Sequence, residues 1–411
     1  MVHTIAVIGG GITGVTTAYA LLQRGYAVTL FERHRYAAME TSFANAGQIS
    51  ACNSEVWNRT ATVLNGIKWM LRKDAPLLIH PQPTWHKLSW LAEFVASIPH
   101  YETNTIATAR LALKARDHLF AWAQAEGIKF DLRTRGILHI YRDAAGFAHG
   151  KDVSRLLQRG GVERQTVSPA EMRTIEPAIS GDFVGGFFTP DDSTGDIHLY
   201  TMGLAAAAQR KGARLLFDHA VQSLIPTAKS VRVHTIADGA AQDAEFDAVV
   251  VCAGVASRAL AASLGDRVNV YPVKGYSITV DLPDPVSRDA APVVSLLDDR
   301  ARVACSRLGE NRLRVAGTAE FNGEDRDIRA GRIQPLIGWV RENFPAVNTR
   351  NAIPWAGLRP MMPNLMPRVG PGRRPGVFYN TGHGHLGWTL AAATAELVAD
   401  SVQAAHPQAA A

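Results

Sequence analysis

The stretch TIAVIGGGITGVTTAYALLQRGYAVTLFE, residues 4–32, decides the fold. Residues 4–8 are an apolar run that ends in glycines, residues 14–24 carry apolar side chains at helical spacing, and residues 27–32 are a second apolar run. A strand, a tight turn, a helix and another strand within about 30 residues form a β-α-β unit, whose crossover is right-handed and whose strands are parallel. The N-terminal part is therefore predicted to be Rossmann-like.

The glycines of the turn fit the dinucleotide fingerprint G-x-G-x-x-G. Gly9 permits the tight turn, Gly11 lets the backbone approach a pyrophosphate, and Gly14 allows the helix to pack closely on the strand. The start of the helix at Ile12 then offers free N–H groups to phosphate oxygens. Glu32 ends the second strand, where a carboxylate can accept hydrogen bonds from ribose hydroxyls. These residues predict a dinucleotide site.

Three further segments favour FAD over NAD as the dinucleotide. Residues 380–389, NTGHGHLGWT, form a glycine-rich turn that opens a helix, whose N-terminus can stabilise negative charge on a reduced flavin. Residues 249–254, VVVCAG, lead a strand into a small-residue turn, and Thr41 and Ser42 offer hydroxyls to a pyrophosphate. Each segment also has a purely structural interpretation, as a helix start, a sheet contact or an N-cap. Glu32 disfavours a dinucleotide with a 2′-phosphate on its ribose. The basic Arg33 nearby keeps that possibility open, and it is therefore a candidate cofactor contact.

The composition is that of a globular protein with two or three domains. The chain has 411 residues, 47% hydrophobic and 19% charged, with a net charge of +6. A mild positive charge suits an anionic ligand such as a carboxylate or a phosphate, and no long Lys/Arg run calls for nucleic acid. Three scattered cysteines predict neither a disulfide framework nor a metal site. No apolar run is long enough to span a membrane and no signal peptide precedes residue 4, so we expect a cytoplasmic protein.

The predicted fold class is α/β (α+β), with a Rossmann-like FAD-binding domain and an inserted antiparallel-sheet substrate domain. Residues 1–52, 148–265 and 350–402 are assigned to the FAD-binding domain, and residues 53–147 and 266–349 to the substrate, or cap, domain. The inserted sheet is predicted from four alternating segments, VNVYPV, YSITVDL, RVACSR and LRVAGT, between residues 267 and 320.

Several motifs, in order along the chain, closely resemble the bacterial D-amino acid dehydrogenases, which belong to the wider superfamily of D-amino acid, glycine and sarcosine oxidases. The resemblance runs from residue 1 to about 400. It is carried by the N-terminal unit and by ETSFANAGQIS (40–50), GIKWMLRKDAPL (66–77), DDSTGDIHLYT (191–201), YPVKGYSITV (271–280), WAGLRPMMP (355–363) and NTGHGHLGWT (380–389).

The resemblance implies an activity and a cofactor. A D-amino acid would be oxidised by non-covalent FAD, its α-hydrogen leaving as a hydride to flavin N5, and the imino acid would hydrolyse to a 2-oxo acid and ammonia. The electrons would pass to a quinone or another acceptor. A glycine, sarcosine or D-hydroxyproline oxidase is the alternative within the enzyme class, and a non-catalytic FAD-binding subunit of a heteromeric oxidoreductase is the alternative outside it.

The resemblance also assigns residues to roles. Arg359 matches the arginine that holds the substrate carboxylate, which suits a guanidinium fork; its structural alternative is to cap carbonyls. Tyr276 and, more weakly, Tyr271 are candidate active-site hydroxyls, and the alternative for Tyr276 is a core aromatic. Val221 matches the residue whose backbone meets the adenine. Gln48 and Ile49 are expected to contact the flavin. The other candidate cofactor contacts are Asn45, Ala46, Gly47, Ala253, Gly254, Gly382, His383, Gly384, Leu386, Gly387, Trp388 and Thr389.

One turn of this chain differs from the family, and one segment has two interpretations. The family reads LRPMTPDG where this chain reads LRPMMPNL at residues 358–365, so a turn beside Arg359 and the substrate range are expected to differ. Residues 57–90 hold four tryptophans and several basic side chains, a combination that suits an anionic membrane surface. The two interpretations are peripheral docking on the inner face of the cell membrane and a helical excursion with packed tryptophans. The members are Trp57, Arg59, Lys68, Trp69, Arg72, Lys73, Trp85, Lys87 and Trp90.

Overall fold

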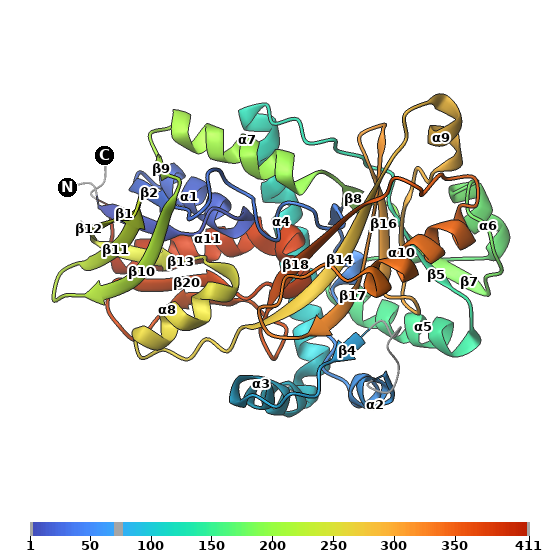
Figure 1. Cartoon of the computed structure of the whole chain (residues 1–411), viewed down its shortest axis with the longest axis horizontal. Helices are drawn as coiled ribbons and strands as arrows, with labels where there is room; N and C mark the ends of the chain where they lie inside the picture. The colour runs from blue at the N-terminus through green and yellow to red at the C-terminus, as the bar shows by residue number, and fades with distance from the viewer. Residues whose placement is uncertain (1–2, 70–76, 409–411) are drawn as a thin grey trace.

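A computed structural model describes residues 3–69 and 77–408. At one end of the molecule lies a six-stranded sheet, counted over these residues, in the order β19-β20-β13-β1-β2-β9 (Figure 1). Its four central pairings, from β20 to β9, are parallel, and β19 is antiparallel to β20. The strands are β1 (Thr4–Ile8), β2 (Ala27–Phe31), β9 (Arg214–Leu216), β13 (Ala248–Val251), β19 (Arg368–Pro371) and β20 (Val377–Thr381).

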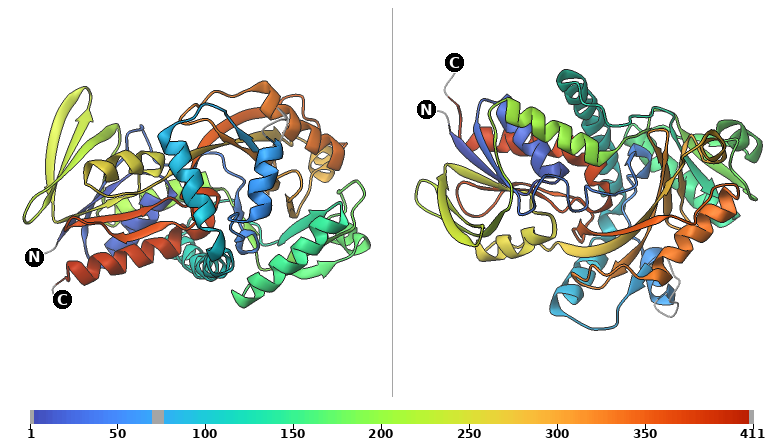
Figure 2. Two further views of the ribbon diagram at one scale, coloured as in Figure 1. Left: turned by 90° about the horizontal axis from the view of Figure 1, so that it is seen from below. Right: turned by 45° about the horizontal axis from the view of Figure 1, so that its top comes forward.

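Side chains of β1 alternate between two apolar cores, as the pleat of a strand dictates. Ile5 and Val7 face a layer of helices, whereas Ala6 and Ile8 face a three-stranded antiparallel meander and a short helix. Figure 2 shows the meander, the sheet and the helices as successive layers. The helices are α1 (Ile12–Gln23), α4 (Tyr101–Glu126), α7 (Ile197–Arg210) and α11 (Gly387–Ala405), and the other side holds β10 (His219–Pro226), β11 (Val231–Ala237), β12 (Ala240–Phe246) and α8 (Ser257–Ser263).

A second, larger sheet fills the other half of the molecule. The sequence predicts an antiparallel sheet, but this sheet is mixed. Strand β5 pairs in parallel with β15, and strand β4 pairs in parallel with β17. Its main order is β18-β14-β17-β16-β15-β5-β7-β6. The strands are β4 (Leu77–Ile79), β5 (Ile137–Tyr141), β6 (Gln165–Val167), β7 (Gly185–Thr189), β14 (Tyr271–Asp281), β15 (Ser295–Asp298), β16 (Val303–Leu308), β17 (Arg312–Phe321) and β18 (Ile353–Met361).

Further helices surround this second sheet. Side chains of α10 and α6 share its apolar core, while α2 and α3 lie beside β4 at the lower edge in Figure 1. The helices are α2 (Thr60–Trp69), α3 (Trp85–Ala96), α5 (Ala144–Arg159), α6 (Pro169–Ile175), α9 (Pro285–Ala290) and α10 (Ala330–Asn343). A two-stranded ribbon, β3 (Gln48–Ile49) with β8 (Ser193–Thr194), joins the two halves of the molecule.

The sequence places β1, α1, β2, α7, β13, β20 and α11 well, but sheet membership differs from the predicted domain boundaries. Strands β6 and β7 and strand β18 belong to the second sheet, although the segments 148–265 and 350–402 that contain them were assigned to the FAD-binding domain. Helix α4, from the predicted cap segment 53–147, packs Leu119 and Trp122 into the core beneath the first sheet. Long-range strand pairing and helix packing decide these memberships.

The predicted strands VNVYPV and YSITVDL do not form separately. Most of both lies in one strand, β14, which is paired to β18 without interruption and to β17 with an irregularity between Lys274 and Tyr276. Opposite this irregularity, Thr318 of β17 adopts a left-handed backbone with φ of +61°. Bulges of this kind redirect side chains and carbonyls near functional sites, and here the bulge lies beside Arg359.

Candidate active site

The glycine turn after β1 has three glycines with different surroundings. A Cβ on Gly9 would come within 2.6 Å of the Cys252 carbonyl oxygen, and one on Gly14 within 1.8 Å of the Gly9 carbonyl oxygen. A Cβ on Gly11 would meet only the Ser42 hydroxyl, at 3.5 Å. Gly9 and Gly14 therefore maintain the backbone packing, whereas Gly11 leaves a cradle at the start of α1. That cradle fits a pyrophosphate.

The carboxylate of Glu32 is anchored at the end of β2. It accepts hydrogen bonds from the Gly10 N–H at 2.6 Å and from the His34 N–H at 2.9 Å, and the side chain is buried. Its remaining lone pairs are available to the hydroxyls of a ribose. Arg33 does not face this carboxylate. Its guanidinium pairs with Glu40, so the structure gives no geometric support to Arg33 as a cofactor contact.

Thr41 and Ser42 connect the cradle to the second sheet. The Ser42 hydroxyl accepts a hydrogen bond from the Ile12 N–H at 3.0 Å, which places it at the N-terminus of α1 beside Gly11. The Thr41 hydroxyl donates to the Leu358 carbonyl at 3.0 Å, on the strand that carries Arg359.

Val221, predicted to meet the adenine, and the predicted cofactor contact Ala253 meet on the meander side of the sheet. Val221 of β10 and Ala253, which follows β13, pack against the same apolar cluster as Phe31. Gly254 has a φ of +55° and nothing within 4 Å of where its Cβ would stand. This arrangement leaves open space beside the carboxyl ends of β1 and β13, where ligands of parallel sheets bind.

The loop from Asn45 to Ile49 runs from the cradle towards the interior. The Asn45 side-chain oxygen accepts from the Gly47 N–H at 2.8 Å, and Gly47 has a φ of +77°. Gln48 donates from its side-chain amide to the Leu296 carbonyl at 3.1 Å. Ala46 and Gln48 line a cavity, whereas Ile49 is packed in the first core.

Helix α11 holds this loop in place. The Trp388 indole N–H donates to the Gly47 carbonyl at 3.3 Å, and the Thr389 hydroxyl accepts from the Ser50 N–H at 3.1 Å. The preceding turn brings Gly382 and Gly384 into left-handed backbone conformations, with φ of +80° and +58°. Gly387 begins α11, and the buried Leu386 packs in a core beside α4 and α5.

His383 does not face the loop. It is buried, its Nε2 lies 2.9 Å from the Thr394 hydroxyl within α11, and burial lowers its pKa to about 3. The side chain is therefore a neutral group that fastens the turn to the helix. The prediction of His383 as a direct cofactor contact gains no support from this geometry.

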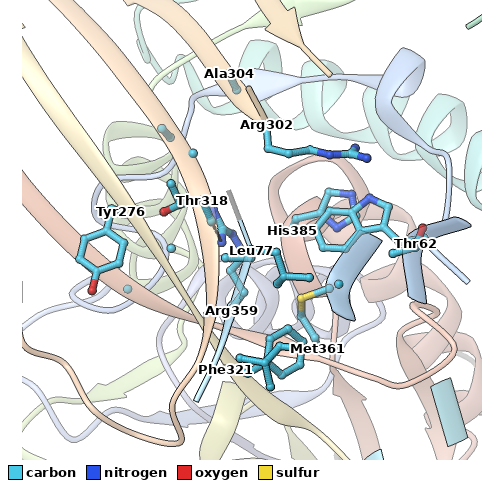
Figure 3. Close-up of a pocket in the computed structure, with 18 of the residues that line it drawn as sticks. Thr62, Leu77, Tyr276, Arg302, Ala304, Thr318, Phe321, Arg359, Met361 and His385 are labelled. Carbon is cyan, nitrogen blue, oxygen red and sulfur yellow. Dashed lines mark hydrogen bonds between the residues drawn. The ribbon is translucent and has the colours of Figure 1, made fainter. Parts of the chain in front are cut away.

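A cavity of about 530 Å³ lies between the 44–48 loop, the second sheet and the helices α2 and α3 (Figure 3). Arg359 projects into it from β18. A Cβ on Gly275 would come within 2.3 Å of the Arg359 guanidinium, so the cation lies across a gap that only glycine leaves open. The guanidinium donates to the carbonyl of Thr318 at 2.9 Å, and the bulge in β17 presents that carbonyl.

Arg359 has no carboxylate within ion-pair distance among the residues that the structure describes. Burial lowers its pKa to about 10, which still leaves it protonated at physiological pH. An enclosed guanidinium with unused N–H donors is a site for an anion, and its fork geometry fits a carboxylate. Arg359 therefore lies where the sequence predicts a substrate carboxylate.

The hydroxyls of the two predicted tyrosines are engaged by protein groups, although Tyr276 is among the residues that line the cavity. The Tyr276 hydroxyl points to the opposite side of the sheet (Figure 3) and donates to the buried Glu320 at 2.7 Å. Burial, followed by the carboxylate of Glu320, raises the pKa of Tyr276. The Tyr271 hydroxyl accepts from the Gly323 N–H at 3.2 Å, and its ring stacks on Phe321. The active-site roles of Tyr276 and Tyr271 stay predictions, and the geometry gives their hydroxyls no support, because β14 turns both rings into packed clusters.

Two cavity residues, His385 and Arg302, are absent from the predicted site residues. His385 stacks on Trp57 with ring centroids 4.4 Å apart, and its Nε2 is buried without a hydrogen-bond partner among the described residues. Burial, together with the charges of Arg359 and Arg302, lowers the pKa of His385 to about 3. Arg302 projects into the cavity from the β15–β16 turn (Figure 3). The GHGH turn was a signal for His385; Arg302 had no local signal.

The Trp-rich segment has mixed surroundings. Trp57 lines the cavity and Trp90 is 2% exposed, whereas Trp85 is 80% exposed. Lys87 is buried and donates to the carbonyls of His80 and Gln82. Arg59 pairs with Glu55. The side chains of Lys68 and Trp69, together with Arg72 and Lys73, lie outside the described residues.

No helix among the described residues is long and apolar enough to cross a membrane. Within the same residues, no group of three or more His, Cys, Asp or Glu side chains could hold a metal ion.

A glycine cradle at the start of α1 and an enclosed guanidinium without an acidic partner among the described residues are the two main features of the site. The family model described as DAO, FAD dependent oxidoreductase, matches residues 4–401, so the chain belongs to this family of oxidoreductases. Two solved structures share its fold. Glycine oxidase from Geobacillus kaustophilus superposes with a TM-score of 0.76 at 22% identity, over 98% of this chain and 95% of that one. L-proline dehydrogenase from P. horikoshii superposes with a TM-score of 0.74 at 17% identity, over 98% of this chain and 94% of that one.

Two curated relatives are more similar to this chain in sequence than the two solved structures are. The chain is 60% identical to D-amino acid dehydrogenase 3 of Mesorhizobium japonicum over 398 residues. These aligned residues cover 97% of this chain and 96% of that protein. It is 40% identical to the D-amino acid dehydrogenase of Paramagnetospirillum magneticum, over 97% of this chain and 94% of that one. The predicted resemblance and the predicted fold class are thereby confirmed.

Proposed function

We propose that this protein oxidatively deaminates D-amino acids to 2-oxo acids and ammonia with non-covalently bound FAD, and passes the electrons to a quinone or another acceptor. The observation that carries the proposal is the enclosed guanidinium of Arg359, which has no acidic partner among the described residues and lies in the same cavity as the 44–48 loop. The identity of 60% to a D-amino acid dehydrogenase supports the same substrate class.

The residues that would hold FAD are those of the cradle and the loop. The N–H groups at the start of α1 and the Ser42 hydroxyl would meet the pyrophosphate, and Glu32 the ribose. Cys52, Cys252 and Cys305 are buried and do not line the cavity, which supports non-covalent binding. FAD, when bound, would accept the two electrons and the α-hydrogen of the substrate as a hydride.

Substrate orientation would be the main contribution of Arg359. Two parallel N–H donors to a carboxylate fix both the position and the rotation of the amino acid, so that the α-hydrogen points in one direction. Thr318 would in turn fix the guanidinium through its carbonyl. Orientation of this kind lowers the barrier without a further acid or base.

The cavity also favours the uncharged amine, from which a hydride can leave. Two guanidinium groups, of Arg359 and Arg302, raise the local positive potential, and the ring of His385 is neutral. The Asp299 carboxylate is engaged by the Tyr141 hydroxyl at 2.6 Å. An ammonium group would therefore be destabilised and would release its proton to solvent on binding. The imino acid product would then react with water to give the 2-oxo acid and ammonia.

The test is reduction of the flavin in the purified protein without oxygen. Bleaching of the yellow spectrum by D-alanine, but not by L-alanine, followed by turnover with a dye acceptor, would support the proposal. Bleaching by sarcosine, glycine or cis-4-hydroxy-D-proline alone would favour the oxidase alternative. Bound flavin with no response to any of these compounds would favour the non-catalytic subunit.

The membrane contact is a separate part of the proposal. The exposed side chains of Trp85 and Leu88 on α3 lie together near the open edge of the cavity, where peripheral docking would bring a membrane-borne quinone close. Flotation with anionic vesicles tests it. We expect binding that falls at least threefold in a Trp85→Ala variant; equal flotation of both proteins, or none, would contradict it.

A further inference from the structure

The cavity has two chemically different walls on either side of Arg359. One wall is apolar and comes from β4, α3, β17 and β18; Figure 3 shows Phe321 and Met361 on the lower side of Arg359 and Arg302 on the upper side. The apolar wall consists of Leu77, Ile79, Trp90, Leu91, Phe321 and Met361. The opposite, polar wall carries Asn53, Asp299, Arg302 and His385.

We propose that the apolar wall is the side-chain subsite, and that it selects D-amino acids with long or bulky apolar side chains over D-alanine and over charged substrates. This inference rests on the proposed function, because it assumes that Arg359 binds the carboxylate of an amino acid.

The polar atoms behind the apolar wall already have partners. The Trp90 indole N–H donates to the Met361 carbonyl at 2.8 Å. The amino group of Lys87, which also lines the cavity, donates to the carbonyls of His80 and Gln82 at 2.9 and 2.8 Å and is therefore engaged by the protein. An apolar side chain can cover this wall without leaving a polar group unsatisfied, whereas a charged side chain would lose its hydration there with nothing to replace it.

Arg359 leaves few ways to orient the substrate. Once its guanidinium holds the carboxylate, the α-carbon presents its hydrogen, its amine and its side chain in three fixed directions. The amine requires a hydrogen-bond acceptor, and the Nε2 atom of the neutral His385 ring, which has no partner among the described residues, lies on the polar wall. The side chain is then directed to the opposite wall. Met361 stands two residues beyond Arg359 on β18, on the same face of the strand, so this wall begins next to the bound carboxylate.

The test is a homologous series of straight-chain substrates: D-alanine, D-2-aminobutyrate, D-norvaline and D-norleucine. Each additional buried methylene contributes about a fourfold increase in affinity for an apolar subsite. We therefore expect kcat/KM, measured with a dye acceptor, to rise about threefold to fourfold per methylene. A binding measurement without turnover accompanies it: the Kd of the oxidised enzyme for propanoate, butanoate, pentanoate and hexanoate, from the flavin difference spectrum, should fall by a similar factor per step.

Variants link the trend to this wall. Leu91→Asp places a carboxylate in the apolar wall and should reduce the increase per methylene to less than 1.5-fold. Val286→Asp, on the exposed face of α9 and outside the cavity lining, is the matched control and should keep the full trend. If Leu91→Asp fails to fold, Leu91→Ala should still weaken the preference for D-norleucine at least threefold.

The outcomes separate this inference from the proposed function. Reduction of the flavin by D-alanine with a flat or falling series would overturn the apolar subsite and leave the D-amino acid dehydrogenase activity standing. A preference for D-aspartate or D-glutamate would also overturn it, and would instead indicate that Arg302 binds the substrate side chain. No reduction by any D-amino acid, with the carboxylate series still binding more tightly with length, would contradict the proposed function alone.

Discussion

Replacement of Arg359 by methionine should have opposite effects on catalysis and on folding. The side chain of methionine fills much of the same space but carries no charge and no N–H donors. If the guanidinium binds the substrate carboxylate through two charge-assisted hydrogen bonds, each contributes about 1.5–3 kcal/mol. The variant should therefore lose about 3–6 kcal/mol of transition-state stabilisation, which is a fall of roughly 10²–10⁴ in kcat/KM.

The stability of the folded protein should not fall with it. Burial lowers the pKa of Arg359 from an ordinary value of 12.5 to about 10, so the charged form costs the folded state up to about 3 kcal/mol. Because the guanidinium faces the cavity, where solvent screens its charge, we use about 1–3 kcal/mol for the cost of the charged form. Methionine removes this cost but leaves the Thr318 carbonyl without its donor, which offsets about 1 kcal/mol. The free energy of unfolding should stay equal or rise by up to about 2 kcal/mol.

The assay combines steady-state turnover of D-alanine with a dye acceptor, the flavin content, and thermal unfolding without substrate. Arg359→Lys should recover part of the loss, because an ammonium keeps the charge but not the fork. Arg302→Met is the matched control, and we expect kcat/KM to change less than tenfold for an uncharged side chain. A kcat/KM within threefold of the parent in Arg359→Met, at equal flavin content, would refute the assignment of this residue to the carboxylate.

Three further perturbations test other parts of the structure. Gly11→Val should fill the cradle and lower the flavin content while the apoprotein still folds, whereas Gly14→Ala should lower the melting temperature, because its Cβ would stand 1.8 Å from a carbonyl oxygen; equal flavin loss with equal stability in both would contradict this. Tyr276→Phe should change kcat less than threefold and reduce the free energy of unfolding by about 1–3 kcal/mol, measured by denaturant titration, because it removes the bond to the buried Glu320; a large fall in kcat would return the hydroxyl to the active site. Burial tends to raise the pKa of Glu40, but Arg326 and the other cationic neighbours lower it to about 2. The Glu40 carboxylate therefore stabilises the folded state above pH 4.5, and this stabilisation is lost as the pH falls towards 2. Glu40→Gln should therefore be less stable by about 1–3 kcal/mol above pH 5, and the difference should shrink in acid; a difference independent of pH would contradict the ion pairing.

The nucleotide-binding half could be predicted because its signals are local. The spacing of Gly9, Gly11 and Gly14 marks the fingerprint turn, and the continuous apolar run of β1 indicates a strand that is buried on both faces. The turn that opens α11 could be read in the same way from its glycines. Arg359 was predicted from a resemblance of motifs, and its isolation from acidic groups became visible only in three dimensions.

The cap half could not be predicted as well, because its geometry depends on distant pairings. A strand turns alternate side chains to opposite faces, so the bulge of β17 at Thr318 decides that Gly275 borders the cavity and that Tyr276 faces Glu320. Nothing in the sequence near Tyr276 specifies that bulge. The membership of β6, β7 and β18 in the second sheet likewise depends on pairing partners far along the chain.

The altered turn at residues 358–365 has a definite structural outcome. Leu365 occupies the position where the family carries glycine, and it adopts a left-handed backbone with φ of +59° while its side chain is buried. A left-handed conformation costs a residue with a side chain about 1–2 kcal/mol. The apolar contact of Leu365 with the cluster around Trp90 offsets part of that cost.

The order of the first sheet governs when the protein can take up its cofactor during synthesis. Strand β1 is made first, yet its partner β13 follows some 240 residues later, and two of the contacts that hold the loop bordering the cavity come from Trp388 and Thr389 of α11. A nascent polypeptide on the ribosome has the glycine turn but neither this neighbouring strand nor these clamps. We therefore expect flavin loading to follow translation, and a premature stop before α11 to yield a colourless product.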